Sequence, residues 1–271
     1  MVANTADDVE VYGVHVSPDP DLVTYWLADA IDEHGYGLAG DSFEVLDALA
    51  AAGRETWFRL GDRDLAMCMI RTELLRSGRP LTEAHAAVVA AMGVDTVVLP
   101  MCDTPVETWV KAAGGWNAFQ EFMIVHGAAG PVEGVELRGI EAARPTPAVL
   151  DALAGAEAIV IGPSNPVISI GPILAVPGMR DALAAAPAPV VAVSPFVGGR
   201  AVKGPTESFC AHAGIEHSAR GIAAAYEGLI DAIVADEDVP GLPSLTIDTL
   251  LDTQDDRRRV ARAALELAQS L

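Results

Sequence analysis

Short apolar runs that alternate with Ala-rich helical segments constrain the fold of this chain most strongly. The candidate strands are Thr96–Leu99, Val135–Arg138, Ala158–Ile161, Val190–Val193 and Ala232–Val234. Helical patterns precede two of them, at Ala148–Ala154 and Gly178–Ala185. A strand that is apolar throughout, such as 158–161, is typical of a sheet buried on both faces. The pattern therefore predicts an α/β protein with a mostly parallel sheet and helices on both faces.

Residues 22–91 have a different character, with hardly any strand pattern. Helical patterns occupy Leu22–Glu33, Ser42–Ala52, Asp62–Ser77 and Thr82–Ala91. We predict that 22–91 form a helical insertion on the α/β core of a single domain spanning 1–271. A chain of 271 residues can bury one sizeable core, and no segment has the composition of a linker.

Five carboxylates lie within the first 21 residues, in two clusters separated by an apolar stretch. The first cluster holds Asp7, Asp8 and Glu10, and the second holds Asp19 and Asp21. Neighbouring carboxylates repel one another, so a fold tends to tolerate them where a cation or a sugar hydroxyl offsets the charge. The alternative interpretation is that these are ordinary turn residues of an acidic chain.

Two loops that follow predicted strands carry groups suited to phosphate. In a parallel sheet, ligands bind outside the carboxyl ends of the strands. The loop Gly162–Pro166 offers the uncharged hydrogen-bonding groups of Ser164 and Asn165 before a helix. The loop Ser194–Pro205 contains a glycine pair, Arg200 and Lys203, which suit a diphosphate. A plain turn and a solvated surface loop, respectively, are the alternatives.

A segment of alternating charge at the start of a predicted helix, Phe58–Ala66, is notable in a chain poor in basic residues. Its arginines, Arg59 and Arg63, are candidates for a function. A structural alternative is that Asp62 or Asp64 caps the helix and pairs with Arg63.

The composition is strongly acidic. The chain has 38 Asp and Glu residues against 17 Lys and Arg, a formal net charge of −21 and a pI near 4.4. Such a surface repels nucleic acids and anionic membranes, so neither is an expected partner. Since 51% of the residues are hydrophobic, the chain is expected to fold. The charge suits a potassium chloride-rich cytoplasm, and a halophilic, archaeal host is our hypothesis.

Other classes of site find little support. The cysteines Cys68, Cys102 and Cys210 are widely spaced and form no C-x-x-C pair, which is typical of buried thiols in a reducing compartment. The six histidines include no H-x-x-x-H arrangement, so zinc is not expected. Apolar runs are too short to span a membrane and no signal-peptide pattern is present, so we expect a soluble, cytoplasmic protein.

Seven motifs together resemble the 2-phospho-L-lactate transferase family of coenzyme F-420 biosynthesis over nearly the whole chain. In order, they are Asn4–Asp8, Ser17–Asp21, Leu60–Asp64, Leu99–Asp103, Phe119–Phe122, Gly162–Pro166 and Ser194–Pro195. The resemblance implies a Rossmann-like core with a helical insertion. It implies magnesium-dependent transfer of phospholactate from lactyl-2-diphospho-5'-guanosine to 7,8-didemethyl-8-hydroxy-5-deazariboflavin, with release of GMP. Some members use an enolpyruvyl donor instead, and a homodimer is usual.

The resemblance also implies roles for individual residues. Asp7 and Asp8 are similar to the catalytic carboxylates that lie near magnesium. Asp21 and Arg59 are similar in position to residues that hold the deazariboflavin, with Asp21 orienting or deprotonating the attacking hydroxyl. Residues expected on the donor side come from the two post-strand loops: Ser164, Asn165, Arg200 and Lys203.

The chain departs from the family pattern in two places. Family members begin with a further strand and a Gly-rich loop before the segment that matches Val2–Asp8. We therefore expect the active form to be a longer protein, and the printed chain to be weakly stable and inactive. The second departure is Cys68, which stands where many members carry His, so no role of that His transfers.

Two other functions are compatible with a chain of this kind. The gluconeogenesis-factor family resembles a non-catalytic regulator that binds nucleotide sugars, and its members have a similar acidic turn. Their loop after the strand is nearer to G-P-G-S than to the Gly162–Asn165 sequence of this chain. A dinucleotide-dependent oxidoreductase would need a G-x-G-x-x-G after a strand, which the sequence lacks. Both comparisons favour the transferase.

Overall fold

The computed structural model describes residues 1–202 and 204–271. The chain divides into two compact units, each taken here by itself. The first comprises Met1–Ala129 and Val135–Val149, and the second comprises Gly130–Gly134 and Leu150–Leu271. That residues 1–271 form a single domain, with 22–91 as a helical insertion, remains a prediction.

A parallel four-stranded sheet is the centre of the second unit. Its strands are β8 (Ile159–Ile161), β9 (Val190–Val193), β12 (Ala232–Ala235) and β13 (Ser244–Thr246). They lie in the order β13-β12-β9-β8, and all three neighbouring pairs are parallel. This sheet confirms the strands expected at 158–161, 190–193 and 232–234.

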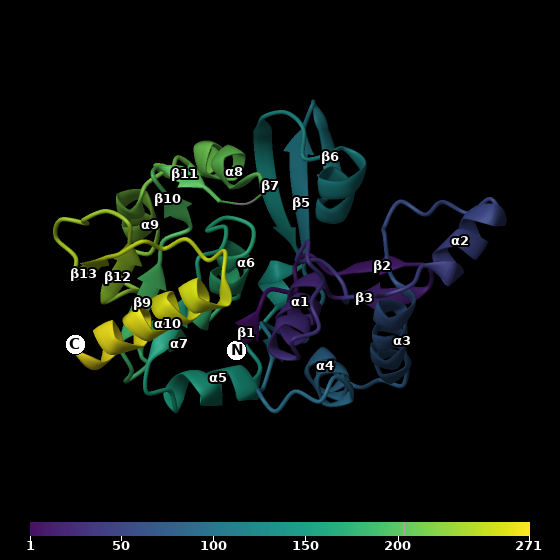
Figure 1. Ribbon diagram of the computed structural model, residues 1–271, viewed down its shortest axis with the longest axis horizontal. Coiled ribbons are helices and arrows are strands. Elements are labelled where there is room, and N and C mark those ends of the chain that lie inside the picture. Colours follow the sequence, from purple (N-terminus) through teal and green to yellow (C-terminus); the bar gives the residue numbers. More distant parts are fainter. Residues whose placement is uncertain (203) are drawn as a thin grey trace. The chain divides into compact units, whose positions relative to one another are not determined.

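Helices cover both faces of this sheet, because alternate residues of each strand point to opposite sides. Val191 and Val193 pack with Val260 and Ala264 of α10 (Gln254–Gln269). Figure 1 shows α10, in yellow, crossing the sheet beside β9 and β12. The opposite face packs mainly against α6, α7, α8 and α9. The predicted α/β class is therefore confirmed.

The remaining elements of the second unit are short. They are α6 (Ile170–Ala175), α7 (Met179–Ala184), α8 (Thr206–Ala213), α9 (Ala219–Ala225), β10 (Phe196–Val197) and β11 (Arg200–Ala201). The residues of α5 (Pro147–Ala154) are divided between the two units after Val149. Leu174 of α6 and Leu183 of α7 pack with Val190 and Ala192, on the side of the sheet away from α10.

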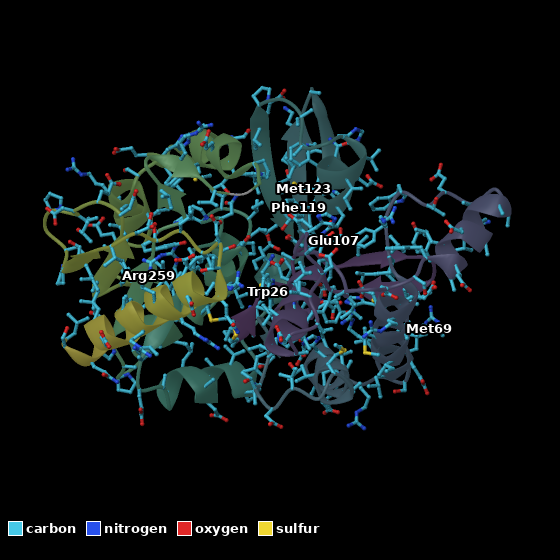
Figure 2. All side chains as sticks on the ribbon, viewed as in Figure 1. Trp26, Met69, Glu107, Phe119, Met123 and Arg259 are labelled. Atoms are coloured by element: carbon cyan, nitrogen blue, oxygen red, sulfur yellow. The ribbon has the colours of Figure 1, made fainter. Side chains whose placement is uncertain are left out.

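The first unit contains three small β structures. Strand β1 (Val2–Ala3) pairs in parallel with β4 (Leu99–Pro100). Strands β2 (Val9–Val11) and β3 (Val14–Val16) form an antiparallel hairpin. A three-stranded sheet has the order β6-β5-β7, with β5 (Glu107–Ala112), β6 (Gly115–Ala118) and β7 (Val132–Arg138), of which residues 132–134 are assigned to the second unit. Glu107 at the start of β5 and Phe119 just after β6 are labelled in Figure 2.

Four helices accompany these strands: α1 (Pro18–Leu27), α2 (Glu44–Ala51), α3 (Asp62–Arg76) and α4 (Leu81–Ala91). A π-helical turn (Glu121–Val125) and a 3₁₀ turn (Ile140–Ala142) complete the unit. In the parts of the chain that the structure describes, no helix is both long and apolar enough to cross a membrane.

Three expected elements differ from the observed ones. The segment 135–138 belongs to the three-stranded sheet, not to the parallel sheet of the second unit. The strand expected at 96–99 is only the two-residue β4. The helix expected at 22–33 runs from Pro18 to Leu27, because prolines suit the first turn of a helix.

In the first unit, Asp41 caps the start of α3 and Asp62 caps the start of α2. The Asp41 carboxylate accepts the N–H groups of Arg63 and Asp64 at the start of α3. The Asp62 carboxylate accepts the N–H groups of Glu44 and Val45 at the start of α2. Asp62 therefore caps α2 rather than its own helix, which corrects the capping role considered for it from the sequence.

Candidate active site

The first acidic cluster forms a turn that Asn4 organises. The Asn4 Oδ1 atom accepts the N–H of Ala6 at 2.9 Å, and Asn4 Nδ2 donates to Asp19 Oδ2 at 3.1 Å. One amide side chain thus shapes the turn that leads to Asp7 and holds a carboxylate of the second cluster. The two clusters, separated by the β2–β3 hairpin in sequence, are joined directly in space.

Asp7 is a buried carboxylate with an unused oxygen. Its side chain is 6% exposed, and its Oδ1 has no hydrogen-bond partner among the described residues. Burial, and then the nearby charge of Asp19, raise the pKa of Asp7 well above its usual value, against side-chain hydrogen bonds from Asn4 and Thr108. Its backbone carbonyl accepts from Gln120 Nε2 at 3.1 Å. A buried, unpartnered acceptor is costly unless a ligand satisfies it.

Asp8 is held at both oxygens. Ser17 Oγ donates to Asp8 Oδ1 at 2.7 Å, and His15 Nε2 lies 2.9 Å from Asp8 Oδ2. Burial raises the pKa of Asp8, and the hydrogen bond from His15 opposes that rise. Burial likewise raises the pKa of Asp19 to about 6, against the hydrogen bond from Asn4. The sequence placed Asp19 in the second acidic cluster without assigning it a role, and it did not identify His15 as part of this site.

The acidic turn fits a divalent cation. The pKa values of Asp7, Asp8 and Asp19 are all raised, so their negative charges lack full compensation from the protein. Mg²⁺ is usually bound by one or two carboxylates together with substrate phosphates and water. The unpartnered Asp7 Oδ1 and the oriented Asp8 carboxylate are oxygen donors of this kind.

Asp21 lies in a different environment, because it forms a buried ion pair with Arg71 of α3. Arg71 Nη1 donates to Asp21 Oδ1 at 2.6 Å and Arg71 Nη2 to Asp21 Oδ2 at 2.7 Å, with Arg71 fully buried. The fork geometry matches the carboxylate and fixes its orientation. Removing one partner of such a pair typically costs about 3–5 kcal/mol of stability. Arg71 was not identified from the sequence, because no local pattern links residues 21 and 71.

A second group of potential metal ligands surrounds this ion pair. Among the residues that the structure describes, Asp21, Asp64 and Cys68 are the group whose ligand atoms lie within 4.8 Å of one another. Arg71 Nη2 lies 3.4 Å from Cys68 Sγ, and the Tyr25 hydroxyl donates to Asp64 Oδ1 at 2.6 Å. A guanidinium already supplies the positive charge here, so this group is a structural network rather than a cation site.

Arg59 is exposed, with its guanidinium over the ring of Phe43 at 4.1 Å from the centroid. It lies next to Phe58, whose backbone N–H and C=O both bond to the Tyr12 hydroxyl. Phe58 also packs edge-to-face with Trp57, with 5.6 Å between the ring centroids. The turn of the β2–β3 hairpin is thus attached to the segment that carries Arg59.

A cleft of about 860 Å³ adjoins this segment in the first unit. The residues that line it include the aromatic residues Tyr12 and Trp57, Leu49 of α2, the polar residues Arg54 and Gln120, and the acidic residues Glu10, Glu55 and Glu121. Gln120 also bonds to the backbone of Asp7, so one residue connects the cleft with the acidic turn. Ligand sites of drug-sized molecules commonly have volumes of about 300–1,000 Å³.

The predicted donor-side residues belong to the second unit. The loop after β8 exposes Ser164 and buries Asn165. Asn165 Oδ1 accepts the N–H groups of Val167 and Ile168 at 2.9 and 3.2 Å, and its Nδ2 donates to Thr206 Oγ1. Asn165 therefore shapes this loop, whereas the Ser164 hydroxyl is accessible to a ligand.

Arg200 is exposed in the β10–β11 hairpin. The turn contains Gly198 and Gly199 with φ angles of +58° and +70°, which favour glycine. Gly198 N–H donates to the Asp236 carboxylate, which fixes the turn. Lys203, the other predicted cation of this loop, lies outside the described residues.

Comparison with known proteins shows which family the chain resembles. Residues 1–261 match the family model described as 2-phospho-L-lactate transferase CofD. A protein named 2-phospho-L-lactate transferase from Methanosarcina mazei is 40% identical over 238 residues, covering 88% of this chain and 78% of its own. A protein named phosphoenolpyruvate transferase from Streptomyces griseus is 37% identical over 287 residues, covering 100% of this chain and 90% of its own.

Solved structures support the fold. A UPF0052-family protein from Bacillus halodurans, of 16% sequence identity, superposes with a TM-score of 0.59 over 97% of this chain and 89% of that one. A second crystal structure of the same Bacillus halodurans protein gives a TM-score of 0.61, also at 16% identity, over 97% of this chain and 90% of that one. At this identity the likeness concerns the α/β fold alone. The match over residues 1–261 and the identities near 40% show that this chain belongs to the 2-phospho-L-lactate transferase family.

Proposed function

We propose that this protein transfers a 2-phospholactyl or enolpyruvyl phosphate group from lactyl-2-diphospho-5'-guanosine, or its enolpyruvyl counterpart, to 7,8-didemethyl-8-hydroxy-5-deazariboflavin. The reaction releases GMP and serves coenzyme F-420 biosynthesis. The observation that carries the proposal is the buried acidic turn, with the unpartnered Oδ1 of Asp7, in a member of this transferase family. Relatives named for phospholactate and for phosphoenolpyruvate both align with the chain, so both donors are tested.

The proposed chemistry is a phosphoryl-type transfer. The ribityl hydroxyl oxygen of the acceptor forms a bond to the phosphorus that carries the lactyl or enolpyruvyl group. The bond from that phosphorus to the bridging oxygen breaks, and GMP leaves with the bridging oxygen. The hydroxyl proton passes to a base. Such reactions depend mainly on in-line positioning and charge neutralisation.

The acidic turn is the proposed magnesium and catalytic region. Asp7 and Asp8 would hold Mg²⁺, which would neutralise negative charge on the donor diphosphate. Asp19, with its pKa raised to about 6, is suited to accept the hydroxyl proton. Asp21 already accepts two hydrogen bonds from Arg71, which suits orientation of the acceptor better than proton abstraction.

The aromatic cleft is the proposed acceptor site. Trp57 and Tyr12 offer flat surfaces for a planar deazaflavin ring. Arg59, whose guanidinium lies over the ring of Phe43, follows Trp57 by two residues and is the proposed cation for the polar edge of the ring system. Ser164, Asn165, Arg200 and Lys203 remain the proposed donor-side residues. We expect a homodimer in the cytoplasm.

The proposal is tested with the protein purified from its complete reading frame, together with Mg²⁺, the deazariboflavin and each of the two guanosine donors. The expected result is that the deazaflavin phosphodiester forms together with an equal amount of GMP. Liquid chromatography measures both products. Asp8→Asn should lower turnover at least a hundredfold while the circular dichroism spectrum stays unchanged, because the neutral amide keeps the shape but attracts the cation weakly. Donor binding without turnover in the wild type would instead indicate a nucleotide-binding regulator.

A further inference from the structure

His15 joins two parts of the first unit that are far apart in sequence. Its ring lies on β3, and its Nε2 approaches Asp8 Oδ2 at 2.9 Å. When Asp8 is ionised, as cation binding requires, its carboxylate only accepts hydrogen bonds, and His15 Nε2 is then the donor of this pair. The other Asp8 oxygen accepts from Ser17, which leaves the carboxylate with one fixed orientation.

Helix α3 holds the backbone of His15 from the other side. His15 N–H donates to Thr72 Oγ1 at 2.7 Å, and its carbonyl accepts from Arg71 Nε and Nη2, both at 3.1 Å. Both backbone groups of His15 thus face the free edge of the β2–β3 hairpin, and two buried side chains of α3 cover that edge. Figure 1 shows α3 running beside β3.

A third contact strengthens this attachment. Arg76, near the end of α3, donates to the carbonyl of Gly13 at 2.8 Å. By contrast, Met69 of the same helix is exposed (Figure 2) and takes no part in the attachment. Arg71 and Thr72 thus attach α3 to β3, and Arg76 attaches it to the turn that precedes β3.

We infer that His15 is a positioning residue, which α3 holds through Arg71 and Thr72 so that the Asp8 carboxylate keeps the orientation needed to bind the cation. Groups that hold a metal ligand from behind commonly set its geometry, and a loss of this support weakens metal binding and activity. The same guanidinium holds both oxygens of Asp21. Arg71 therefore ties together the supports of two carboxylates that the proposed reaction uses. This inference rests on the proposed function, because it assumes that Asp8 binds the cation.

The test compares three single variants with the wild type. His15→Leu removes the donor, His15→Gln retains an N–H that can reach Asp8, and His34→Leu changes an exposed histidine that is remote from β3 in sequence. Mn²⁺ binding by electron paramagnetic resonance and the half-saturating Mg²⁺ concentration of the transfer reaction are measured for each. His15→Leu should weaken Mn²⁺ binding and raise the half-saturating Mg²⁺ concentration at least tenfold, with the KM of the deazariboflavin changed less than threefold.

The remaining variants give the controls. His15→Gln should recover metal binding to within about threefold of the wild type, and His34→Leu should match it. A melting temperature of His15→Leu within a few degrees of the wild type separates positioning from a purely structural role. If His15→Leu unfolds, His15→Gln decides: wild-type metal affinity supports the inference, whereas a tenfold loss in this folded variant overturns it.

The two proposals fail in different ways. Unchanged turnover and Mn²⁺ binding in Asp8→Asn would defeat the proposed metal role itself. Loss in Asp8→Asn together with unchanged Mn²⁺ affinity in His15→Leu would leave the proposed function standing and overturn the positioning role.

Discussion

At the scale of single residues, burial of charge is what distinguishes the first unit. Asp64 illustrates it, because its carboxylate lies beside Asp21 in the network around Arg71. Burial, and then the charge of Asp21, raise the pKa of Asp64 from 3.8 to about 6. The folded protein therefore binds this proton more tightly than the unfolded chain does. Stability attributable to the group is present below about pH 4 and falls as the pH rises through about 6.

We predict that Asp64→Asn removes this pH dependence. The amide oxygen still accepts from the Tyr25 hydroxyl, but no buried charge forms at neutral pH. Relative to the wild type, the variant should gain about 1–3 kcal/mol of unfolding free energy between pH 4 and pH 7.5. Urea unfolding at both pH values measures this, with the exposed Asp47→Asn as control for the general effect of removing a negative charge. Equal pH dependence in both variants would contradict it.

At the scale of elements, the junction of α2 and α3 depends on a close approach at Gly61. A Cβ atom at Gly61 would lie 2.3 Å from Asp41 Oδ2 and 2.6 Å from Asp41 Cγ. The Asp41 carboxylate cannot move away freely, because it accepts the N–H groups of Arg63 and Asp64 that begin α3. Gly61, the glycine of the Gly-Asp-Arg-Asp motif, therefore leaves the space that the Asp41 carboxylate needs to cap α3.

Gly61→Ala should lower the unfolding free energy by about 1–3 kcal/mol, because the methyl group displaces Asp41 from the N-terminus of α3. Gly115→Ala is the matched control, since a Cβ there meets no atom within 4 Å and the φ angle is not positive. The midpoint of urea unfolding measures both variants. Equal midpoints would show that the cap tolerates the methyl group.

At the scale of the whole molecule, the net charge of −21 dominates. Like charges on one chain repel, and salt screens them over a Debye length that falls from about 10 Å at 0.1 M to about 3 Å at 1 M. We predict that the urea midpoint rises between 0.1 and 2 M KCl, most of it below 1 M. Chloride is used because sulfate would also stabilise by exclusion from the surface. Full stability at 0.1 M KCl, with no further rise, would contradict the halophilic interpretation.

Local pattern was enough to predict the parallel sheet. The runs at 158–161, 190–193 and 232–234 became β8, β9 and β12. The central strands β9 and β12 are buried along their whole length, as a strand covered on both faces must be, whereas β8 lies at the edge of the sheet and exposes Val160, which the apolar run at 158–161 did not predict. The helices expected at 62–77 and 82–91 also formed within a residue or two. The β2–β3 hairpin was missed, although Val9–Val16 alternates and Tyr12-Gly13 provides the positive φ angles of its turn.

The sequence by itself determined which segments form the parallel sheet, because runs of apolar residues indicate buried strands. It also showed that carboxylates gather near the amino terminus, because both acidic clusters lie within the first 21 residues. Only the tertiary structure decided which groups meet: Arg71 with Asp21, His15 with Asp8, and Asp62 with the start of α2. These pairs are separated by 50, 7 and 18 residues. Such contacts depend on how helices and strands pack, and no periodicity of 2 or 3.6 residues specifies them.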